Sequence, residues 1–395
     1  MNLLYACADS ATDPLVWSGI VLNCRRALES AGAEVEIMDN IPFECPVHLR
    51  LLHQIHKRFG RKSHILQIEP AILHRAARRI AARFTQGGYD AVFSPGTTPP
   101  VYALVPASIP VFAYLDASKV SWIRTYFGLN TICERSRRHV EAVDRASLGH
   151  NAMTFFASHW AVAEAVRDYG IPMDRMAVVP FGANLVDPPT RAEVEGWIGA
   201  RPRDALRLFF LGKEWERKGG PEALDLVREL RARGVAATLD VVGCNPVLND
   251  ADRALVELHG FIDHSRPEGR EKVRQLLARA HVLLFFSHAE AFGIAVCEAA
   301  AFGVPAFAAD VGGIPTIVRP GINGWLMPAA FSAAEGAATL QASFARDGEY
   351  QRLARGARDD FETRLNWPAA GATLVQHIER ALARRSSKRD HIGFT

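Results

Sequence analysis

Short apolar runs alternate with amphipathic segments along almost the whole chain, and this alternation limits the fold more than any other feature of the sequence. The run Leu206–Leu211, for example, has the length of a buried strand, and Pro221–Arg233 after it has apolar residues at helical spacing. Strands that alternate with helices form βαβ units, and these build parallel sheets with helices on their faces. The sequence therefore predicts an α/β fold.

The alternation occurs twice, on either side of a stretch rich in proline and charge at residues 187–204, which has the composition of a linker. The expected strands are residues 2–7, 34–38, 91–94, 111–115, 154–157 and 176–179 before this stretch, and 206–211, 237–242, 256–261, 281–286, 306–309 and 325–327 after it. A chain of 395 residues also exceeds the length at which one core usually keeps growing. We therefore expect two Rossmann-like domains, at residues 1–186 and 187–366.

The C-terminal part has a pattern of its own. Residues 367–384 carry apolar side chains at helical spacing and predict a helix that packs on a core. The residues after them, 385–395, are charged and polar, and we expect a flexible tail there.

Composition indicates the class of protein and the cellular compartment. Its hydrophobic content of 49% and charged content of 23% are ordinary for a globular protein. The six cysteines are scattered without a Cys-x-x-Cys pair, which argues against a disulfide framework or a zinc site and indicates a reducing compartment. The longest apolar stretch, residues 291–309, is interrupted by Glu298, Gly303 and Pro305, so no membrane span is expected. We expect a cytoplasmic protein without a bound metal.

The segment after the expected strand His281–Phe286 carries the most functional information. It contains a Phe292-Gly293 pair between two glutamates, Glu290 and Glu298. A helix that starts near Phe292 would place the amides of Gly293 and Ile294 in its first turn, where they can bind a phosphate. A strand, a glycine turn and a helix start therefore predict a nucleotide or sugar-phosphate site.

Glu298 lies within an otherwise apolar part of this expected helix. Carboxylates are seldom buried without a partner. A ribose diol is one suitable partner, because an ionised carboxylate accepts hydrogen bonds from two hydroxyl groups. A local cap or salt bridge is the alternative.

Two further loops follow strands in the same half of the chain. After Leu206–Leu211 come three cations, Lys213, Arg217 and Lys218, and then two glycines that open a helix. Cations beside a helix N-terminus suit a diphosphate, although a solvated charged turn has the same composition. The second loop contains Gly312 and Gly313, which permit a ligand to approach the backbone closely.

With these motifs the chain resembles the group 1 glycosyltransferases of the GT-B fold. The resemblance rests on Phe210–Gly220, Glu290–Glu298 and Val311–Pro315, with support from Ser158–Ala161 and Val178–Asn184. It implies two Rossmann-like domains that face a central cleft, with the C-terminal helix crossing back to the N-terminal domain. It also implies a retaining, metal-independent hexosyltransferase of glycan biosynthesis, which takes a UDP- or GDP-sugar and needs no cofactor. The donor would bind the C-terminal domain and the acceptor the N-terminal domain.

The same resemblance implies roles for individual residues. Glu298 would hold the ribose, and Glu290 would lie beside the donor sugar. Lys218 matches the family's phosphate-binding lysine, and Lys213 stands where the family usually has arginine. Asp116 follows the fourth expected strand, where many members place a histidine, and we expect it to orient the sugar or the acceptor. The implied catalytic residues are Glu290, Lys218 and Asp116, and the implied donor-binding residues are Gly19, Lys213, Arg217, Lys218, Phe292, Gly293, Ile294, Glu298, Gly312 and Gly313.

Two other functions remain open at the level of the sequence. An epimerase of the same fold would use the donor site without a separate acceptor. A non-catalytic nucleotide-sugar-binding protein would suit the absence of the histidine and the presence of Thr316, where the family often has glutamate.

A basic stretch lies in the expected acceptor domain. Residues 48–83 contain nine lysines and arginines and a single acid, Glu69, although the net charge of the whole chain is only +3. Arg75, Arg78, Arg79 and Arg83 share one face of an expected helix. This asymmetry indicates an anionic acceptor or an anionic membrane surface, with a solvated helix face as the alternative. Aromatic residues are not interleaved there in a stacking pattern, so we do not expect a nucleic acid.

Overall fold

The computed structural model describes residues 1–42, 44–59, 62–96, 105–106, 108–346 and 348–392, with side chains described up to residue 385. The chain divides into two compact units. The first unit is Met1–Phe181 together with the C-terminal segment that begins at Trp367, and the second unit is Gly182–Asn366. The sequence had placed this division after residue 186.

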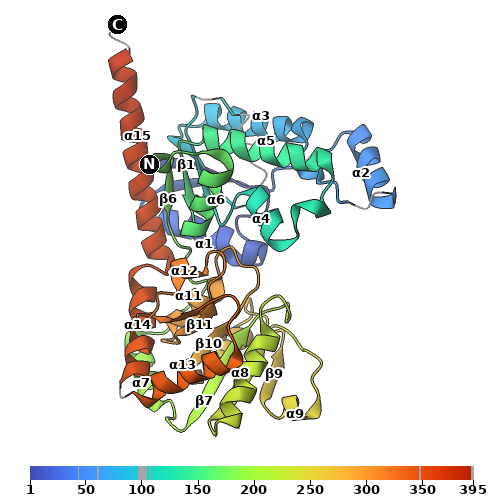
Figure 1. The fold of residues 1–395 in the computed structure, drawn as a ribbon. Helices are drawn as coiled ribbons and strands as arrows, with labels where there is room; N and C mark the ends of the chain where they lie inside the picture. The colour runs from blue at the N-terminus through green and yellow to red at the C-terminus, as the bar shows by residue number, and fades with distance from the viewer. Residues whose placement is uncertain (43, 60–61, 97–104, 107, 347, 393–395) are drawn as a thin grey trace. The chain divides into compact units, whose positions relative to one another are not determined.

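The first unit is built on a six-stranded sheet in the order β2-β1-β3-β4-β5-β6 (Figure 1). Every pair of neighbouring strands is parallel. The strands are β1 (Asn2–Ala6), β2 (Glu34–Met38), β3 (Ala91–Pro95), β4 (Val111–Leu115), β5 (Met153–Phe156) and β6 (Met176–Val178).

Helices pack on both faces of this sheet. The helices of the unit are α1 (Ile20–Ser30), α2 (Val47–Phe59), α3 (Pro70–Gln86), α4 (Lys119–Tyr126), α5 (Glu134–His150), α6 (His159–Tyr169) and α15 (Trp367–Ile392), of which α2 lies at the periphery (Figure 1). Along β1, side chains alternate between the faces: Leu4 packs in one core with Leu73 of α3, and the hydroxyl of Tyr5 donates to the carbonyl of Val21 of α1, at 2.6 Å. Alternate residues of the strand therefore hold α3 and α1 on opposite faces.

The second unit has a six-stranded parallel sheet in the order β12-β11-β10-β7-β8-β9. Its strands are β7 (Ala205–Leu211), β8 (Ala236–Val242), β9 (Val256–Gly260), β10 (Val282–Phe285), β11 (Ala306–Ala309) and β12 (Gly324–Met327). Its helices are α7 (Arg191–Ala200), α8 (Gly220–Ala232), α9 (Asp250–Arg253), α10 (Pro267–Arg279), α11 (Ile294–Ala301), α12 (Ile314–Ile317), α13 (Ala333–Ala345) and α14 (Glu349–Thr363).

The strand order of the second unit fixes where a ligand can enter. From β7 the chain proceeds outward through β8 to β9, and then returns to the other side of β7 to form β10, β11 and β12. The order of the sheet therefore reverses between β7 and β10. In open α/β sheets, ligands bind outside the carboxyl ends of the strands at such a switch point.

The expected α/β architecture is confirmed. Every one of the strands predicted from the sequence is present, and each end lies within one residue of its predicted position. Most strands are predictable because they are short runs of buried apolar residues, such as Leu3, Leu4 and Tyr5, which have no exposed surface. The edge strand β2 is an exception, because none of its residues is fully buried.

The predicted linker at residues 187–204 is wrong in part, because it contains helix α7. Thr190 accepts a hydrogen bond from the amide of Glu193, and Glu193 in turn accepts from the amide of Thr190, which is a complete capping box. Val194 and Ile198 of this helix pack in a core with residues of α14. The prolines before Thr190 therefore end one segment and leave the helix after it intact.

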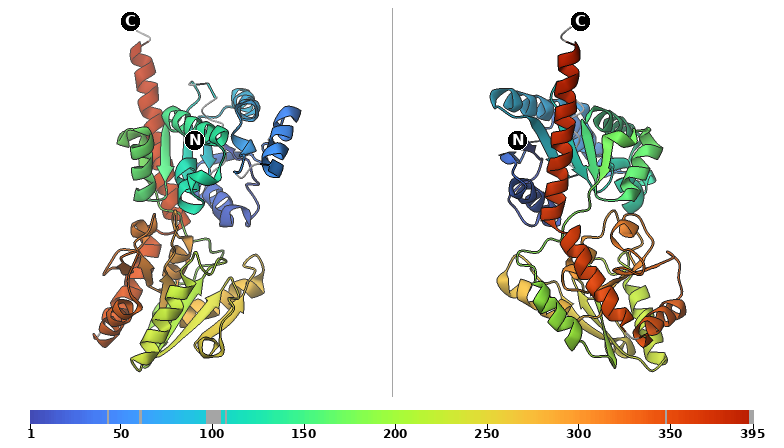
Figure 2. Two further views of the ribbon diagram at one scale, coloured as in Figure 1. Left: turned by 45° about the vertical axis from the view of Figure 1, so that its right-hand side comes forward. Right: turned by 90° about the vertical axis from the view of Figure 1, so that its left-hand side faces the viewer.

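The C-terminal helix is longer than predicted. It begins at Trp367, as expected, but continues to Ile392, through most of the predicted flexible tail; residues 393–395 lie outside the described part. The extension contains Arg385, Lys388 and Arg389, and both of these residue types have high helix propensity, so charge alone did not stop the helix. Figure 2 shows α15 along the first unit, where it packs against α1.

Candidate active site

The carboxyl ends of β7 and β10 bring together two of the predicted residues. Lys218 lies in the loop between β7 and α8, and Glu290 lies in the loop between β10 and α11. The Lys218 ammonium forms an ion pair with Glu290 Oε2. Glu290 is only 7% exposed, and the Lys218 side chain is 18% exposed. The pair therefore stands at the switch point of the sheet, with limited access to solvent.

Neighbouring groups hold this pair in place. The hydroxyl of Ser287, which is completely buried, donates to the same Glu290 oxygen at 3.3 Å. The Lys218 ammonium lies 5.2 Å from the centre of the Phe285 ring, so the ring face adds a cation–π attraction. A salt bridge with little solvent around it interacts more strongly than an exposed one.

Glycine makes the approach of the two loops possible. Gly219 has a φ of +76°, and a Cβ built there would lie 2.2 Å from the Phe286 carbonyl oxygen. The backbone after β7 therefore touches the end of β10 directly. No other residue fits at that distance without displacing one of the two loops.

The Arg217 side chain ties the same two loops together. Its Nη1 donates to the Ala289 carbonyl at 3.0 Å, while Nε and Nη2 donate to the two carboxylate oxygens of Glu214, at 2.9 and 2.7 Å. The Arg217 carbonyl accepts from the His288 amide at 2.9 Å. In this arrangement Arg217 positions the loops.

Lys213 lies at the other side of the β7 loop. Its side chain is exposed, and its ammonium is 5.3 Å from the centre of the Phe261 ring, which follows β9. Phe261 is itself 65% exposed. The three predicted cations thus have different surroundings: Lys218 is half-buried and paired, Arg217 cross-links two loops, and Lys213 is exposed.

The loop with Gly312 and Gly313 packs backbone to backbone against the Glu290 loop. The Gly313 amide donates to the Glu290 carbonyl at 3.0 Å. A Cβ built on Gly312 would lie 1.9 Å from that same carbonyl oxygen, and one on Gly313 would lie 2.0 Å from the Ala291 carbonyl oxygen. The three loops after β7, β10 and β11 therefore form one continuous structure around Glu290.

Helix α11 starts two residues later than predicted, at Ile294, with Gly293 as its N-cap at a φ of +100°. The Phe292 side chain is buried, at 3% exposure. Amides in the first turn of a helix have no acceptor within the helix and carry the positive end of its dipole. This helix terminus follows Glu290 by four residues.

Glu298 is half-buried in the middle of α11. Burial raises the pKa of its carboxyl group to about 8, against the opposing effect of a hydrogen bond from the Asn184 backbone. Asn184 belongs to the Val178–Asn184 segment that the sequence resemblance had included. Glu298 thus has a backbone partner within the second unit. With a pKa of about 8, its carboxyl group is mostly protonated at neutral pH.

Gly19 and Asp116 belong to the first unit. Gly19 is the N-cap of α1, at a φ of +86°, and the two residues before it, Trp17 and Ser18, also have positive φ values of 45° and 55°. Three consecutive residues in this region are unusual and indicate a backbone that its surroundings hold in place. The rings of Trp17 and Phe181 pack edge to face, with their centres 5.3 Å apart.

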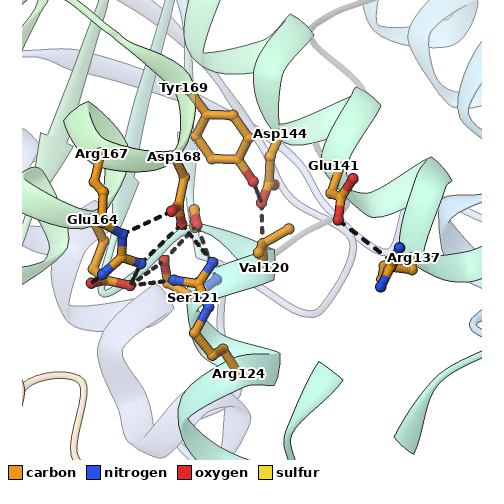
Figure 3. A network of polar contacts seen from close by, with 11 residues as sticks. Val120, Ser121, Arg124, Arg137, Glu141, Asp144, Glu164, Arg167, Asp168 and Tyr169 are labelled. Atoms are coloured by element: carbon orange, nitrogen blue, oxygen red, sulfur yellow. Dashed lines mark hydrogen bonds and ion pairs between the residues drawn. The ribbon is translucent and has the colours of Figure 1, made fainter. Parts of the chain in front are cut away.

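Asp116 is 8% exposed and follows β4 directly. The helix after it, α4, is held by a buried carboxylate: Asp144 accepts from the Val120 amide at 2.8 Å and from the Tyr169 hydroxyl at 3.0 Å (Figure 3). Burial raises the pKa of Asp144 to about 6. Arg124 at the other end of α4 binds Glu164 and Asp168, so both ends of the helix are fixed.

Three of the four arginines on the predicted basic face of α3 form ion pairs with acids of the same unit. Arg75 and Arg79 form ion pairs with Glu44, and Arg83 forms one with Glu36. Both acids lie outside the stretch of residues 48–83, so its composition did not reveal them. Arg61 lies outside the described residues.

One group of residues of the kinds that bind metals occurs in the described part of the second unit. Donor atoms of Asp240, Glu257 and His259 lie within 4.8 Å of one another. The Arg279 guanidinium donates to Asp240 at 2.5 Å and to Glu257 at 2.9 Å. Arg207 also forms an ion pair with Glu257, at 3.7 Å. Because two arginines pair with the two carboxylates, the group is an ion-pair network.

Sequence reasoning missed Ser287 and Glu214. Ser287 is the first polar residue after the buried strand β10, and this position was a usable signal because site residues follow strand ends. The role of Glu214 depends on the conformation of the loop, since it binds a residue three positions away.

Comparison with known proteins agrees with this geometry. Residues 205–343 match the family model of group 1 glycosyl transferases. A D-inositol 3-phosphate glycosyltransferase from Xylanimonas cellulosilytica is 30% identical over 239 residues, which are 57% of this chain and 56% of that protein. A putative colanic acid biosynthesis glycosyltransferase, WcaL, from Salmonella typhimurium is 28% identical and covers 56% of this chain and 53% of its own length. The chain thus spans a little over half the length of these curated relatives.

Solved structures match over nearly the whole chain. A glycosyltransferase from Rickettsia africae has a TM-score of 0.64 at 14% identity and covers 96% of this chain and 98% of its own. Anabaena HepE, solved in complex with UDP, has a TM-score of 0.63 at 16% identity, with 96% and 100% covered. At these identities the structures show a shared fold. The family match thus concerns residues 205–343, within the second unit, and the solved structures show that the chain has the GT-B fold of these glycosyltransferases.

Proposed function

We propose that this protein transfers a hexosyl group from a nucleotide-diphosphate sugar to an acceptor hydroxyl. The observation that carries the proposal is the pair of Lys218 and Glu290 at the switch point between β7 and β10. A ligand is expected at this position of the sheet, and the pair offers it one cation and one carboxylate.

The donor would replace part of this ion pair. A diphosphate carries more negative charge than a carboxylate, so Lys218 would turn to the phosphates, and the first-turn amides at Gly293 and Ile294 would add hydrogen bonds. Lys213 is exposed and available to the same charge, while Arg217 would keep the loops in position. Glu298 would bind the ribose, and Glu290 would then face the transferred sugar.

The proposed reaction is retaining and needs neither metal nor cofactor. The bond between C1 of the sugar and the diphosphate oxygen breaks, and the acceptor hydroxyl oxygen forms the new bond to C1 on the same face. The hydroxyl proton goes to the departing diphosphate. Lys218 stabilises the charge that develops on this leaving group, and this kind of interaction usually supplies the largest share of catalysis.

The donor is proposed to be a UDP- or GDP-sugar. Support comes from Anabaena HepE, whose structures contain UDP and, in one case, glucose. The acceptor is proposed to carry an anionic group, as the D-inositol 3-phosphate of the matched relatives does. Asp116, near the carboxyl edge of the first sheet, would orient the acceptor or sugar.

The test is a transfer assay with a panel of UDP- and GDP-sugars, in which added acceptor is required for product. Lys218→Ala and Glu298→Ala should each lower turnover at least about a hundredfold, because each removes a charged or ionisable donor contact. Lys272→Ala, on the exposed surface of α10, is the matched control. Near-normal turnover in Lys218→Ala, with an unchanged melting temperature, would exclude the proposal.

A further inference from the structure

Helix α2 leaves an apolar stripe outside the core of the first unit. Four of its side chains are exposed: Val47 by 71%, Leu51 by 61%, Ile55 by 56% and Phe59 by 78%. They follow one another at intervals of four residues, which places them along one side of the helix. Among the helical residues that the structure describes, no other helix contributes more than one large exposed apolar side chain.

The opposite side of α2 attaches the helix to the unit. Leu49 is buried, at 3% exposure. The rings of His53 and His56 lie 5.8 and 5.2 Å from the ring of His64, which is buried and bonded to Glu69 at 2.8 Å. Because this inner side makes the attachment, the apolar stripe is not needed to hold the helix. Figures 1 and 2 show α2 at the periphery of the first unit.

The charges on α2 all have one sign. Residues 47–59 include Arg50, Lys57 and Arg58 and no aspartate or glutamate, and all three cations are exposed. Arg50 and Arg58 each lie three residues from a member of the stripe, Val47 and Ile55, so they are its neighbours on the helix surface. A basic edge thus borders the apolar stripe.

We propose that α2 binds the surface of an anionic lipid bilayer and lies in its plane, with the apolar stripe at the boundary of the acyl chains. An amphipathic helix with apolar residues on one side and lysine or arginine beside them has the chemistry for this position. Neither signal alone anchors a protein stably, but an apolar face combined with basic residues does. Among the described residues, no helix is both long enough and apolar enough to cross a membrane.

Charge decides between a bilayer and the other possible occupants. A second copy of this helix would place like charges opposite one another, which opposes association. The surface of an anionic bilayer is negatively charged throughout, so it complements the basic residues of α2 wherever the helix binds. On α3, by contrast, Arg75, Arg79 and Arg83 already pair with acids of the same unit. Among the described residues, Arg50, Lys57 and Arg58 of α2 have no acidic partner; Arg50 donates only to the Cys45 carbonyl. The proposal does not depend on glycosyl transfer.

The experiment is co-sedimentation of the full chain with phosphatidylcholine vesicles that contain phosphatidylglycerol, without any sugar donor. Binding is expected at low ionic strength, with weaker binding to pure phosphatidylcholine and at high salt. Replacing the stripe in Leu51→Ser, Ile55→Ser, Phe59→Ser should weaken binding more than about tenfold, because three apolar side chains no longer leave water. Lys57→Glu with Arg58→Glu should weaken it by roughly tenfold or more.

The control replaces three apolar residues of similar exposure elsewhere: Met173→Ser, Val186→Ser, Val247→Ser, with exposures of 64%, 61% and 101%. It should bind as the wild type does, and all variants should keep the wild-type melting temperature because the altered side chains are exposed. Absence of wild-type binding, or equal binding by the stripe variant, would overturn the proposal. The proposal would also be overturned if the stripe variant bound vesicles normally but formed a smaller oligomer than the wild type in sedimentation velocity. The stripe would then be a contact between copies of the chain.

Discussion

At the scale of single residues, the structure separates the two glutamates that the sequence presents as a pair. Glu290 is buried against Lys218 and completes an ion pair at the switch point of the sheet. Glu298 is half-buried on α11, with a backbone partner and a raised pKa. The sequence shows only that the two glutamates lie eight residues apart. The structure shows that their surroundings differ, and these surroundings give the two carboxyl groups different chemistry.

The raised pKa of Glu298 predicts a pH dependence of nucleotide binding. In the free protein its pKa is about 8, and hydroxyl groups that donate to the carboxylate would favour the ionised form and lower this pKa on binding. Binding at pH 7 should therefore release a proton, and affinity should rise up to about tenfold per pH unit until the pH reaches the free pKa. Calorimetry in buffers of different ionisation enthalpy measures this release.

The variant Glu298→Gln provides the comparison. Its affinity should be nearly constant over the same pH range, and no proton should be released at this site. Proton uptake by the wild type, or identical pH profiles for the two proteins, would be inconsistent with a role of Glu298 at the ribose.

At the scale of elements, the contacts between loops depend on glycines. Gly312 has a φ of +55° and lies against the Glu290 carbonyl, whereas Gly321 has a φ of +74°, and a Cβ built there would have no neighbour within 4 Å. Both substitutions to alanine incur the strain of a positive φ, about 1–2 kcal/mol. Only Gly312→Ala also adds a steric clash.

Gly312→Ala is therefore expected to cost at least about 1 kcal/mol more stability than Gly321→Ala, and to lower nucleotide affinity as well because it displaces Glu290. Chemical denaturation and calorimetry measure the two effects. Equal losses of stability with unchanged affinity in both variants would show that the loop contact is unimportant for the site.

Asp144, which holds the N-terminus of α4, predicts a stability effect of opposite sign to that of most carboxylates. Its folded pKa of about 6 lies above the value of about 4 for an unfolded aspartate, so its destabilising contribution is absent at low pH and grows as pH rises from 4 to 6. The stability of the wild type relative to Asp144→Asn should thus fall by about 2–3 kcal/mol over this range. Thermal unfolding of both proteins at several pH values tests it, and a constant difference would refute it.

At the scale of the whole molecule, the fold was more predictable than the site. Most strands are runs of buried apolar residues such as those of β10, and burial on both faces leaves a strong pattern in the sequence. Helix α7 was missed because its prolines were given more weight than the capping box at Thr190 and Glu193. The pairing of Arg79 with Glu44 joins residues 35 positions apart, and no local pattern encodes such a contact. Sequence thus identified which loops to examine, while partners within them required the structure.

The attachment of α15 to the first unit gives a prediction about the chain as a whole. A Cβ built on Gly371 of α15 would lie 2.2 Å from the Ala27 carbonyl of α1, while Gly196 of α7 has nothing within 4 Å. Alanine usually stabilises a helix by about 1 kcal/mol relative to glycine. We expect Gly196→Ala to raise the melting temperature and Gly371→Ala to lower it, as measured by calorimetry. A rise in both would mean that α15 does not pack closely on α1.

The central claim is that the pair of Lys218 and Glu290 marks the site of a nucleotide diphosphate. The most direct measurement is a calorimetric titration of UDP and GDP into the wild type, Lys218→Met and the surface control Lys272→Met. The wild type and the control should bind one of the two nucleotides equally well, and Lys218→Met should bind it at least about tenfold more weakly, because a charge-assisted hydrogen bond to phosphate is lost. Equal affinity in all three proteins, or no binding of either nucleotide by the wild type, would contradict the account.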